Sequence, residues 1–261
     1  MGRLPDFLGL GAQRAGTTLV YELLSRHPQI CMAKGRKEVH FFDCYFERGP
    51  VWYASLFTHC GDKRCGEITP AYLHDPRCPA RIHGLLPDVR LFVILRDPVE
   101  RAYSQFKLEV RERGFNGSFE DFLKAFPDAI SRGLYYQQLT RYYALFHREN
   151  ILVLLFEDLI QRTDEEIGKL LAFLDVAPLP GPLMPREKVN PGVIPRAHRL
   201  YIAGKRITSW LHDHDLSGVV MVLKRCGLEK LFFSQRQKAS SFPPWSLSHV
   251  PSSSKSFGMM S

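Results

Sequence analysis

Short apolar runs recur along the chain and alternate with segments of helical periodicity. Runs rich in apolar and β-branched residues predict four strands and a shorter fifth one, at residues 6–10, 29–32, 90–95, 151–156 and near residues 64–66. The runs at 91–95 and 151–155 are continuously apolar instead of alternating with polar residues. Such continuity is typical of central strands in a parallel sheet that is covered on both faces.

Three segments predict helices because an apolar residue recurs every three or four positions, at residues 99–111, 135–146 and 163–174. In the last segment, residues 164–166 are all acidic and occupy the first turn, where the helix dipole favours negative charge. Strands that alternate with helices predict an α/β fold of three layers around a central parallel sheet.

The pattern changes after residue 174. Six prolines between residues 178 and 195 predict a long loop, and helical periodicity resumes at residues 196–211 and 219–226. From Ser234 onward Ser, Pro, Gln and Lys dominate without a period, which is typical of a flexible segment. We therefore expect one domain over residues 1–233 and a flexible C-terminal tail over residues 234–261.

Composition places the chain among ordinary globular proteins, with 45% apolar and 24% charged residues. Its longest apolar runs are far too short to span a bilayer, and no leader of the secretory type follows Met1. We therefore expect a cytoplasmic protein without a membrane span. The alternative is the Golgi lumen, if the sequence is a portion of a longer anchored protein.

The formal net charge of +8 favours anionic partners such as nucleotides, acidic glycans, nucleic acid or anionic lipids. The six cysteines form no CxxC pair, which argues against a zinc site. Cys60 and Cys65 lie close enough in sequence to bridge a short loop in an oxidising compartment. Without a leader, reduced cysteines are the expectation.

A glycine-rich loop follows the first predicted strand and precedes a helical segment. The stretch 11–18 reads GAQRAGTT, and this order of strand, turn and helix aims backbone N–H groups at an anion. The phosphate-binding loop of ATPases, G-x-x-x-x-G-K-[ST], has a lysine where this chain has Thr17. The cation lies earlier, at Arg14, so the loop suits a nucleotide anion without γ-phosphate chemistry; a decorated glycine turn is the alternative.

A second polar segment follows the strand predicted at residues 90–95. Ligands of open parallel sheets bind beyond the carboxyl ends of the strands, so this segment and the glycine-rich loop should line one crevice. Arg96 and Ser104 could hold a second phosphate there. A helix-start ion pair of Arg96 with Asp97 and a solvated Ser104 is the alternative.

The segment 37–43 reads KEVHFFD, and strand-like alternation would place Glu38 and His40 on one face. Burial beside Phe41 and Phe42 would raise the pKa of Glu38, which could then act as a general base toward an acceptor hydroxyl. A half-buried strand with a hydrated polar face is an equally good interpretation of this segment alone.

Four motifs follow one another along the chain: QRAGTT at 13–18, KEVHFFD at 37–43, GEITPAYL at 66–73 and LRDP at 95–98 with Arg101 and Ser104 after it. Together they resemble the motif series of sulfotransferases that use 3′-phosphoadenosine 5′-phosphosulfate (PAPS) as donor. The pattern is most similar to heparan sulfate 3-O-sulfotransferases, N-sulfotransferases and their bacterial relatives. The resemblance extends over residues 7–159 and fades in the proline-rich loop.

The resemblance implies a P-loop-NTPase-like sulfotransferase fold and a role for each matching residue. The loop formed by Arg14, Ala15, Gly16, Thr17 and Thr18 matches the family's 5′-phosphosulfate loop.

Outside that loop, Arg96 and Ser104 match the 3′-phosphate pair and Glu38 matches the catalytic base. His40 would orient Glu38 or the acceptor, and Tyr135 belongs to a further segment that contacts the cofactor. Arg196, which follows the proline-rich loop, is a weaker candidate for donor contact.

The chain also departs from the pattern of those families. Arg14 stands where glycan-modifying members usually have lysine, although protein-tyrosine sulfotransferases carry arginine there. Ile68 stands where the 3-O-sulfotransferases place a lysine, so one expected catalytic cation is missing.

The expected reaction moves the sulfuryl group of PAPS to a hydroxyl or amino group of an acceptor by in-line attack and releases adenosine 3′,5′-bisphosphate (PAP). A glycan is the acceptor class that the resemblance suggests. Arg14 would stabilise the leaving group without any metal, because loop amides and a helix N-terminus add positive charge. The rival interpretations are a P-loop nucleotide kinase and a non-catalytic polyanion-binding module. Dispersed basic residues argue against nucleic acid as a partner, and the oligomeric state stays open.

Overall fold

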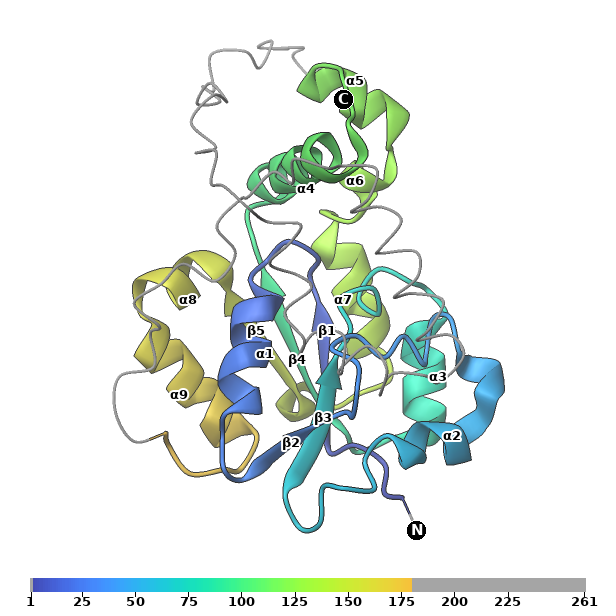
Figure 1. Ribbon diagram of the computed structural model, residues 1–261, viewed down its shortest axis with the longest axis vertical. Coiled ribbons are helices and arrows are strands. Elements are labelled where there is room, and N and C mark those ends of the chain that lie inside the picture. The colour runs from blue at the N-terminus through green and yellow to red at the C-terminus, as the bar shows by residue number, and fades with distance from the viewer. Residues whose placement is uncertain (1, 180–261) are drawn as a thin grey trace, which may run out of the picture.

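A computed structural model describes residues 2–179 of the chain, in which five parallel strands form one sheet (Figure 1). The strand order is β2-β3-β1-β4-β5. The strands are β1 (Phe7–Gly11), β2 (Ile30–Met32), β3 (Arg64–Ile68), β4 (Arg90–Leu95) and β5 (Ile151–Leu155). Because β1 pairs with both β3 and β4, it lies at the centre of the sheet, and the loop that follows it lies between the ends of two other strands.

Helices cover both faces of the sheet and extend beyond one edge. In Figure 1, α1, α8 and α9 lie on one side of the strands and α3 and α7 on the other, while α4, α5 and α6 gather past the carboxyl ends. Short helices α2 and η1 adjoin α3, and η2 precedes β5. The bounds are α1 (Thr17–Ser25), η1 (Phe46–Arg48), α2 (Gly49–Ser55), α3 (Cys78–Leu85), α4 (Pro98–Arg113), α5 (Phe119–Ala125), α6 (Asp128–Ser131), α7 (Tyr135–Tyr143), η2 (Arg148–Asn150), α8 (Phe156–Gln161) and α9 (Thr163–Phe173).

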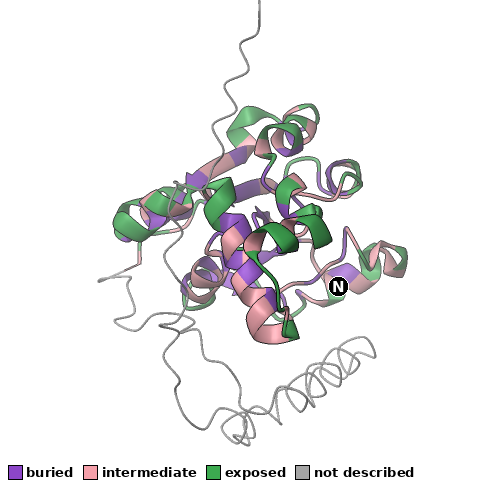
Figure 2. Ribbon diagram, turned by 90° about the horizontal axis from the view of Figure 1, so that it is seen from above, coloured by how far each residue is buried: buried purple, intermediate pink, exposed green. Residues whose placement is uncertain are grey.

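The core consists of the strands and the helix faces that pack on them, as the buried residues in the centre of Figure 2 show. All five residues of β1 are buried, and so are the four interior residues of β4. A second apolar cluster around Phe106 and Phe122 joins α4 to α5. This cluster fixes the outer helices to α4, which carries part of the site described below.

The predicted three-layer α/β fold is confirmed, with two corrections in detail. Residues 151–155 form the edge strand β5 instead of a central one, and Leu155 is 48% exposed. A continuous apolar run does not distinguish a central strand from an edge strand whose faces are both covered. Residues 37–43 form no strand but a loop and a turn, in which His40 has a positive φ of 58°.

The expectation about cysteines is wrong as well. Cys60 pairs with Cys31, 29 positions away, in a disulfide that joins β2 to the turn after α2, whereas Cys65 stays free and buried. The thiol of Cys65 lies 3.5 Å from the carbonyl of Leu4, and burial raises its pKa to about 12. A contact between distant segments thus replaces the local loop suggested by sequence spacing.

None of the helices between residues 2 and 179 combines the length and the apolar character that crossing a bilayer requires. The helices expected at 196–211 and 219–226 and the boundary at residue 233 lie outside the described residues, so they stay predictions.

Candidate functional site

The glycine-rich loop joins the end of β1 to the start of α1, and Gly16 is a position that needs glycine. Gly16 has a φ of 82°, and a Cβ added there would lie 2.9 Å from the ring of Phe156. Arg14 also adopts the left-handed conformation, with a φ of 68°. The side chain of Ala15 is fully buried and that of Thr17 nearly so, so a ligand would meet the backbone of this loop.

The N-terminus of α1 can bind an anion through its backbone amides. The first amides of a helix lack an acceptor within the helix and carry a partial positive charge. No side chain caps this end, and its first turn contains no acidic residue. An external anion can therefore take the place that a capping side chain occupies elsewhere.

The structure brings the second predicted segment to the same place. The Nε of Arg14 donates a hydrogen bond of 3.2 Å to the Oγ of Ser104 on α4. The Nη1 of Arg96, directly after β4, donates to the backbone carbonyl of Arg14 over 3.2 Å. The hydroxyl of Tyr135, the first residue of α7, donates to the carbonyl of Arg96 at 2.9 Å. Four predicted site residues thus lie in one contact network. They come from the β1–α1 junction, from the β4–α4 junction with α4 itself, and from the start of α7.

This network brings two cationic side chains, Arg14 and Arg96, close together. Burial lowers the pKa of Arg14, and repulsion from Arg111 and Arg96 lowers it further, while Glu112 acts in the opposite direction. The Nε of Arg96 is buried without a hydrogen-bond partner. Its guanidinium stacks over the ring of Phe156 at 4.7 Å and reaches Glu100 at 3.3 Å. A ligand with two anionic groups fits this donor set.

Glu38 and His40 also lie together, although through a loop. The Nε2 of His40 is 3.5 Å from Oε2 of Glu38, and its Nδ1 is 2.8 Å from Oδ2 of Asp43. Both Glu38 and His40 are about one-third exposed, at 35% and 33%. An imidazole held between two carboxylates has its orientation fixed by both of them.

The protonation of this group differs from the expectation. Burial acts to raise the pKa of Glu38, but the hydrogen bond from His40 and the charges of Lys37 and His40 outweigh it, so the net direction is downward. For His40, burial acts downward, and the contacts with Asp43 and Glu38 overcome it and raise the pKa to about 10. At neutral pH the proton therefore resides on His40, and Glu38 is an ionised proton acceptor.

Two functional candidates escaped the sequence analysis. The Nζ of Lys37 donates to Oγ1 of Thr18 at 2.7 Å and lies 3.5 Å from Oε1 of Glu38, so it connects the glycine-rich loop with the carboxylate. Asp43 holds the far side of His40. Both belong to the KEVHFFD segment, where a cation beside Glu38 and an acid three positions after His40 are the signals. Arg196, in contrast, lies outside the described residues.

Comparison with known proteins agrees with the family that the sequence motifs resemble. A sequence model of the sulfotransferase domain matches residues 4–188 of the chain. The chain belongs to the sulfotransferase family.

Individual relatives agree with this assignment. Human heparan sulfate glucosamine 3-O-sulfotransferase 6 is 33% identical over 181 residues, which cover 66% of this chain and 52% of that protein. Membrane-associated sulfotransferase kil1 of Dictyostelium discoideum is 36% identical over 112 residues, or 41% of this chain and 24% of that one. The chain spans about half the length of the curated 3-O-sulfotransferases it matches.

Solved sulfotransferase structures share the fold. A sulfotransferase from Alicyclobacillus acidocaldarius superposes with a TM-score of 0.64 at 25% identity, over 80% of this chain and 96% of that chain. Mouse SULT7A1, solved as a complex with PAP, gives a TM-score of 0.50 at 17% identity, over 67% of this chain and 60% of that one.

Two groups in the described part of this sulfotransferase-family chain are compact enough to hold a metal ion. In the first, formed with His59, both thiols are already joined in the Cys31–Cys60 disulfide. The second consists of His40, Asp43 and Cys44, where the ion pair engages the first two side chains.

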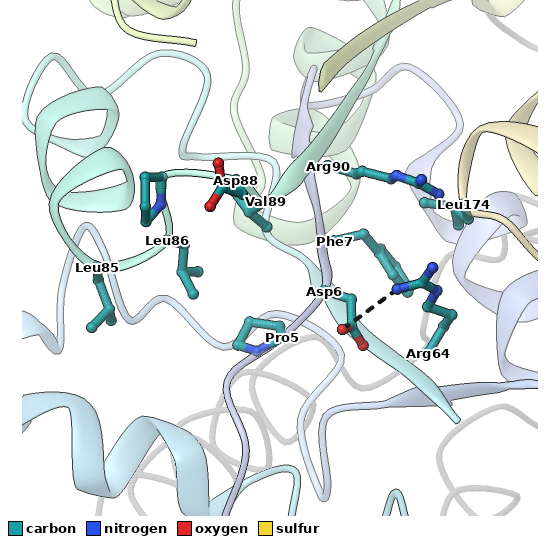
Figure 3. A pocket seen from close by; sticks show the side chains of 11 residues that line it. Pro5, Asp6, Phe7, Arg64, Leu85, Leu86, Asp88, Val89, Arg90 and Leu174 are labelled. Atoms are coloured by element: carbon teal, nitrogen blue, oxygen red, sulfur yellow. Dashed lines mark ion pairs between the residues drawn. The ribbon is translucent and has the colours of Figure 1, made fainter. Parts of the chain in front are cut away.

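A hollow of about 410 Å³ lies at the amino ends of β1, β3 and β4, opposite the end of the sheet that carries the glycine-rich loop (Figure 3). Asp6 and Arg64 approach to 3.8 Å there, and Arg64 also pairs with Asp175 at 2.7 Å. Because Asp6 and Arg64 are paired there and none of the predicted site residues lines it, we assign no ligand to this hollow.

Proposed function

We propose that this chain catalyses the transfer of the sulfuryl group of PAPS to a hydroxyl group of an acceptor, with a glycan as the acceptor class. The observation that carries the proposal is the convergence of Arg14, Arg96 and Ser104 from two strand–helix junctions. A ligand with phosphates at both ends of a ribose can engage two separate anion sites of this kind. Family membership adds the donor class, and mouse SULT7A1, which shares the fold, was solved with PAP.

In this proposal each anionic group of the donor has its own partners. Arg96 and Ser104 hold the 3′-phosphate, and Tyr135 fixes the backbone of Arg96. The loop from Arg14 to Thr18 and the N-terminus of α1 hold the 5′-phosphate with its sulfuryl group. The repulsion that Arg14 experiences from Arg111 and Arg96 and the unpaired, buried Nε of Arg96 support this assignment.

Proton transfer is assigned to Glu38. Its ionised carboxylate accepts the proton of the acceptor hydroxyl while that oxygen forms a bond to sulfur and the bond from sulfur to the phosphate oxygen breaks. The electron pair of the broken bond leaves with the phosphate, where Arg14 and Lys37 stabilise the negative charge. His40 keeps Glu38 oriented and ionised, as its 3.5 Å contact supports. These groups supply the positive charge that the reaction needs, so the proposal assigns no step to a metal.

The acceptor class rests on the relatives, several of which are named heparan sulfate glucosamine 3-O-sulfotransferases. The Glu38 carboxylate can accept the proton of a carbohydrate hydroxyl. The net positive charge of the chain favours an acidic glycan. An amino group of a glycan is the other nucleophile that the same geometry accepts. A nucleotide kinase is not favoured, because Thr17 occupies the position of the lysine that reaches the β- and γ-phosphates.

The relatives also bear on location. None of them supports the expected cytoplasmic placement, and one is named as membrane-associated. We therefore favour the alternative placement in the Golgi lumen. The Cys31–Cys60 disulfide supports the same choice, because disulfides persist in oxidising compartments.

The direct test combines donor binding with transfer. Calorimetry should show PAP binding to the wild-type chain, and Arg96→Ala should weaken it about 10- to 100-fold, the effect of a charge-assisted hydrogen bond to phosphate. Lys124→Ala is the matched control, since that side chain is 80% exposed and lies on α5. With labelled PAPS, heparan sulfate should accept the sulfuryl group. Absence of PAP binding together with absence of transfer to glycan acceptors would refute the proposal.

A further inference from the structure

Glu67 on β3 is a fully buried carboxylate surrounded by hydroxyl groups. Its Oε1 accepts hydrogen bonds from the hydroxyls of Tyr53 and Tyr72, each at 2.8 Å. Its Oε2 accepts from the hydroxyl of Thr69 at 2.5 Å and from the amide of Val39 at 3.4 Å. Glu67 has no exposed surface, so it does not contact substrate. Burying a carboxylate costs free energy even when four donors surround it. We therefore expect the contacts of Glu67 to serve the structure or the site.

Two of the hydroxyls that donate to Glu67 also accept hydrogen bonds from the loop that carries Glu38 and His40. The Oγ1 of Thr69 accepts from the amide of Val39 at 3.0 Å and from that of His40 at 3.3 Å. The hydroxyl of Tyr72 accepts from the amides of Phe41 and Phe42, at 2.8 and 3.4 Å. The backbone of four consecutive loop residues is thus attached to β3 through two side chains.

The carboxylate determines which way these hydroxyl hydrogens point. A carboxylate only accepts, so each hydroxyl beside it directs its hydrogen toward Glu67 and presents its oxygen lone pairs to the loop amides. A hydroxyl that turned its hydrogen toward the loop would meet another donor. The loop needs this support because His40 is held in the left-handed conformation, which is unfavourable for a residue with a Cβ.

We propose that Glu67, acting through Thr69 and Tyr72, is a positioning residue that fixes the backbone under Glu38 and His40 in its reactive geometry. Burial raises the pKa of Glu67 above its ordinary value, and the hydrogen bonds from its four donors oppose this rise and favour the accepting form. The inference rests on the proposed function only for its kinetic consequence. Its structural consequence, the position of the His40 ring between Glu38 and Asp43, stands separately.

Two tyrosines provide a matched pair of variants. Tyr53→Phe and Tyr72→Phe each remove one buried hydroxyl that donates to Glu67 at 2.8 Å. Only Tyr72 also accepts from the loop, so only Tyr72→Phe breaks the connection from Glu67 to Phe41. The two variants should lose similar thermal stability. Thr69→Val breaks the other branch, and Thr69→Ser, which keeps the hydroxyl, should restore it.

The expected kinetic result is a loss in kcat without a loss in donor binding. Tyr72→Phe and Thr69→Val should each lower kcat about 10- to 100-fold, because a displacement of about 1 Å at reacting groups costs that much. PAP affinity should stay within about 2-fold of wild type, and Tyr53→Phe and Thr69→Ser should stay within about 3-fold in kcat. Equal kcat values for Tyr53→Phe and Tyr72→Phe would overturn the inference.

A second readout needs no catalysis. In an NMR titration, His40 of the wild type should titrate near pH 10, since its neighbours Glu38 and Asp43 raise its pKa to about 10. Tyr72→Phe should move this titration toward the ordinary value near 6.5, and Tyr53→Phe should not. If the wild type transfers no sulfuryl group while this difference persists, the proposed function fails and the positioning role holds. If transfer occurs and His40 titrates alike in both variants, the positioning role fails.

Discussion

Replacing His40 by asparagine should shift the pH dependence of turnover, because His40 keeps Glu38 ionised. Its imidazolium lies 3.5 Å from the Glu38 carboxylate and lowers the pKa of that group against the effect of burial. Asparagine removes the charge and still tolerates the left-handed backbone that this position requires, where φ is 58°. The substitution therefore tests the charge and spares the loop.

The distance sets the size of the effect. Two unit charges at 3.5 Å interact by about 4 to 5 kcal/mol at an effective dielectric constant of about 20 and by about 1 kcal/mol in water. Because both side chains are about one-third exposed, at 33% and 35%, solvent screening brings the coupling to about 2 kcal/mol. Loss of this coupling destabilises the ionised carboxylate, so the pKa of Glu38 should rise in the variant.

The assay is kcat/KM for sulfuryl transfer as a function of pH. Glu38 must be ionised to accept a proton, so the rate falls as the pH drops through its pKa. In the wild type this pKa is lowered and the acid limb lies below the ordinary value of 4.5. In His40→Asn the limb should move to higher pH, whereas His147→Asn, on the exposed surface, should leave it in place. Coincident acid limbs for His40→Asn and the wild type would refute the reasoning.

Three further predictions concern single residues. Glu38→Gln should lower kcat by about two to four orders of magnitude, the usual contribution of a general base, with PAP affinity unchanged in calorimetry; near-normal turnover would exclude Glu38 as the base. Arg14→Ala should weaken PAP binding and lower kcat, and a variant normal in both would remove Arg14 from the site. Cys31→Ser should lower the free energy of unfolding by about 3 kcal/mol, because it opens a loop of 29 positions. Cys44→Ser, at an exposed free thiol, is its control in urea denaturation, and equal losses would contradict the role of the disulfide.

The parts of the fold that depend on hydrophobic pattern could be predicted from the sequence. The runs at residues 90–95 and 151–156 mark β4 and β5 to within a residue, because buried strands need continuous apolar side chains. The sequence also predicted that Arg14 and Arg96 lie close together, because the carboxyl ends of parallel strands line one crevice. Short helices such as α6, with four residues, leave too weak a period to detect.

Features that depend on contacts between distant segments could not be predicted. Glu38 and His40 do lie together, but a loop with a positive φ at His40 brings them there instead of strand alternation. The pKa of Glu38 is lowered because nearby cations outweigh burial, a balance that requires distances. The network around Glu67 joins three segments through hydroxyl groups, and residue type alone does not show which hydroxyls meet.

The most direct measurement is a crystal structure of this chain with PAP. The 3′-phosphate should lie against Arg96 and Ser104 and the 5′-phosphate at the N-terminus of α1, within reach of Arg14. PAP bound at another surface, or with its phosphates away from both strand–helix junctions, would contradict the proposed donor site.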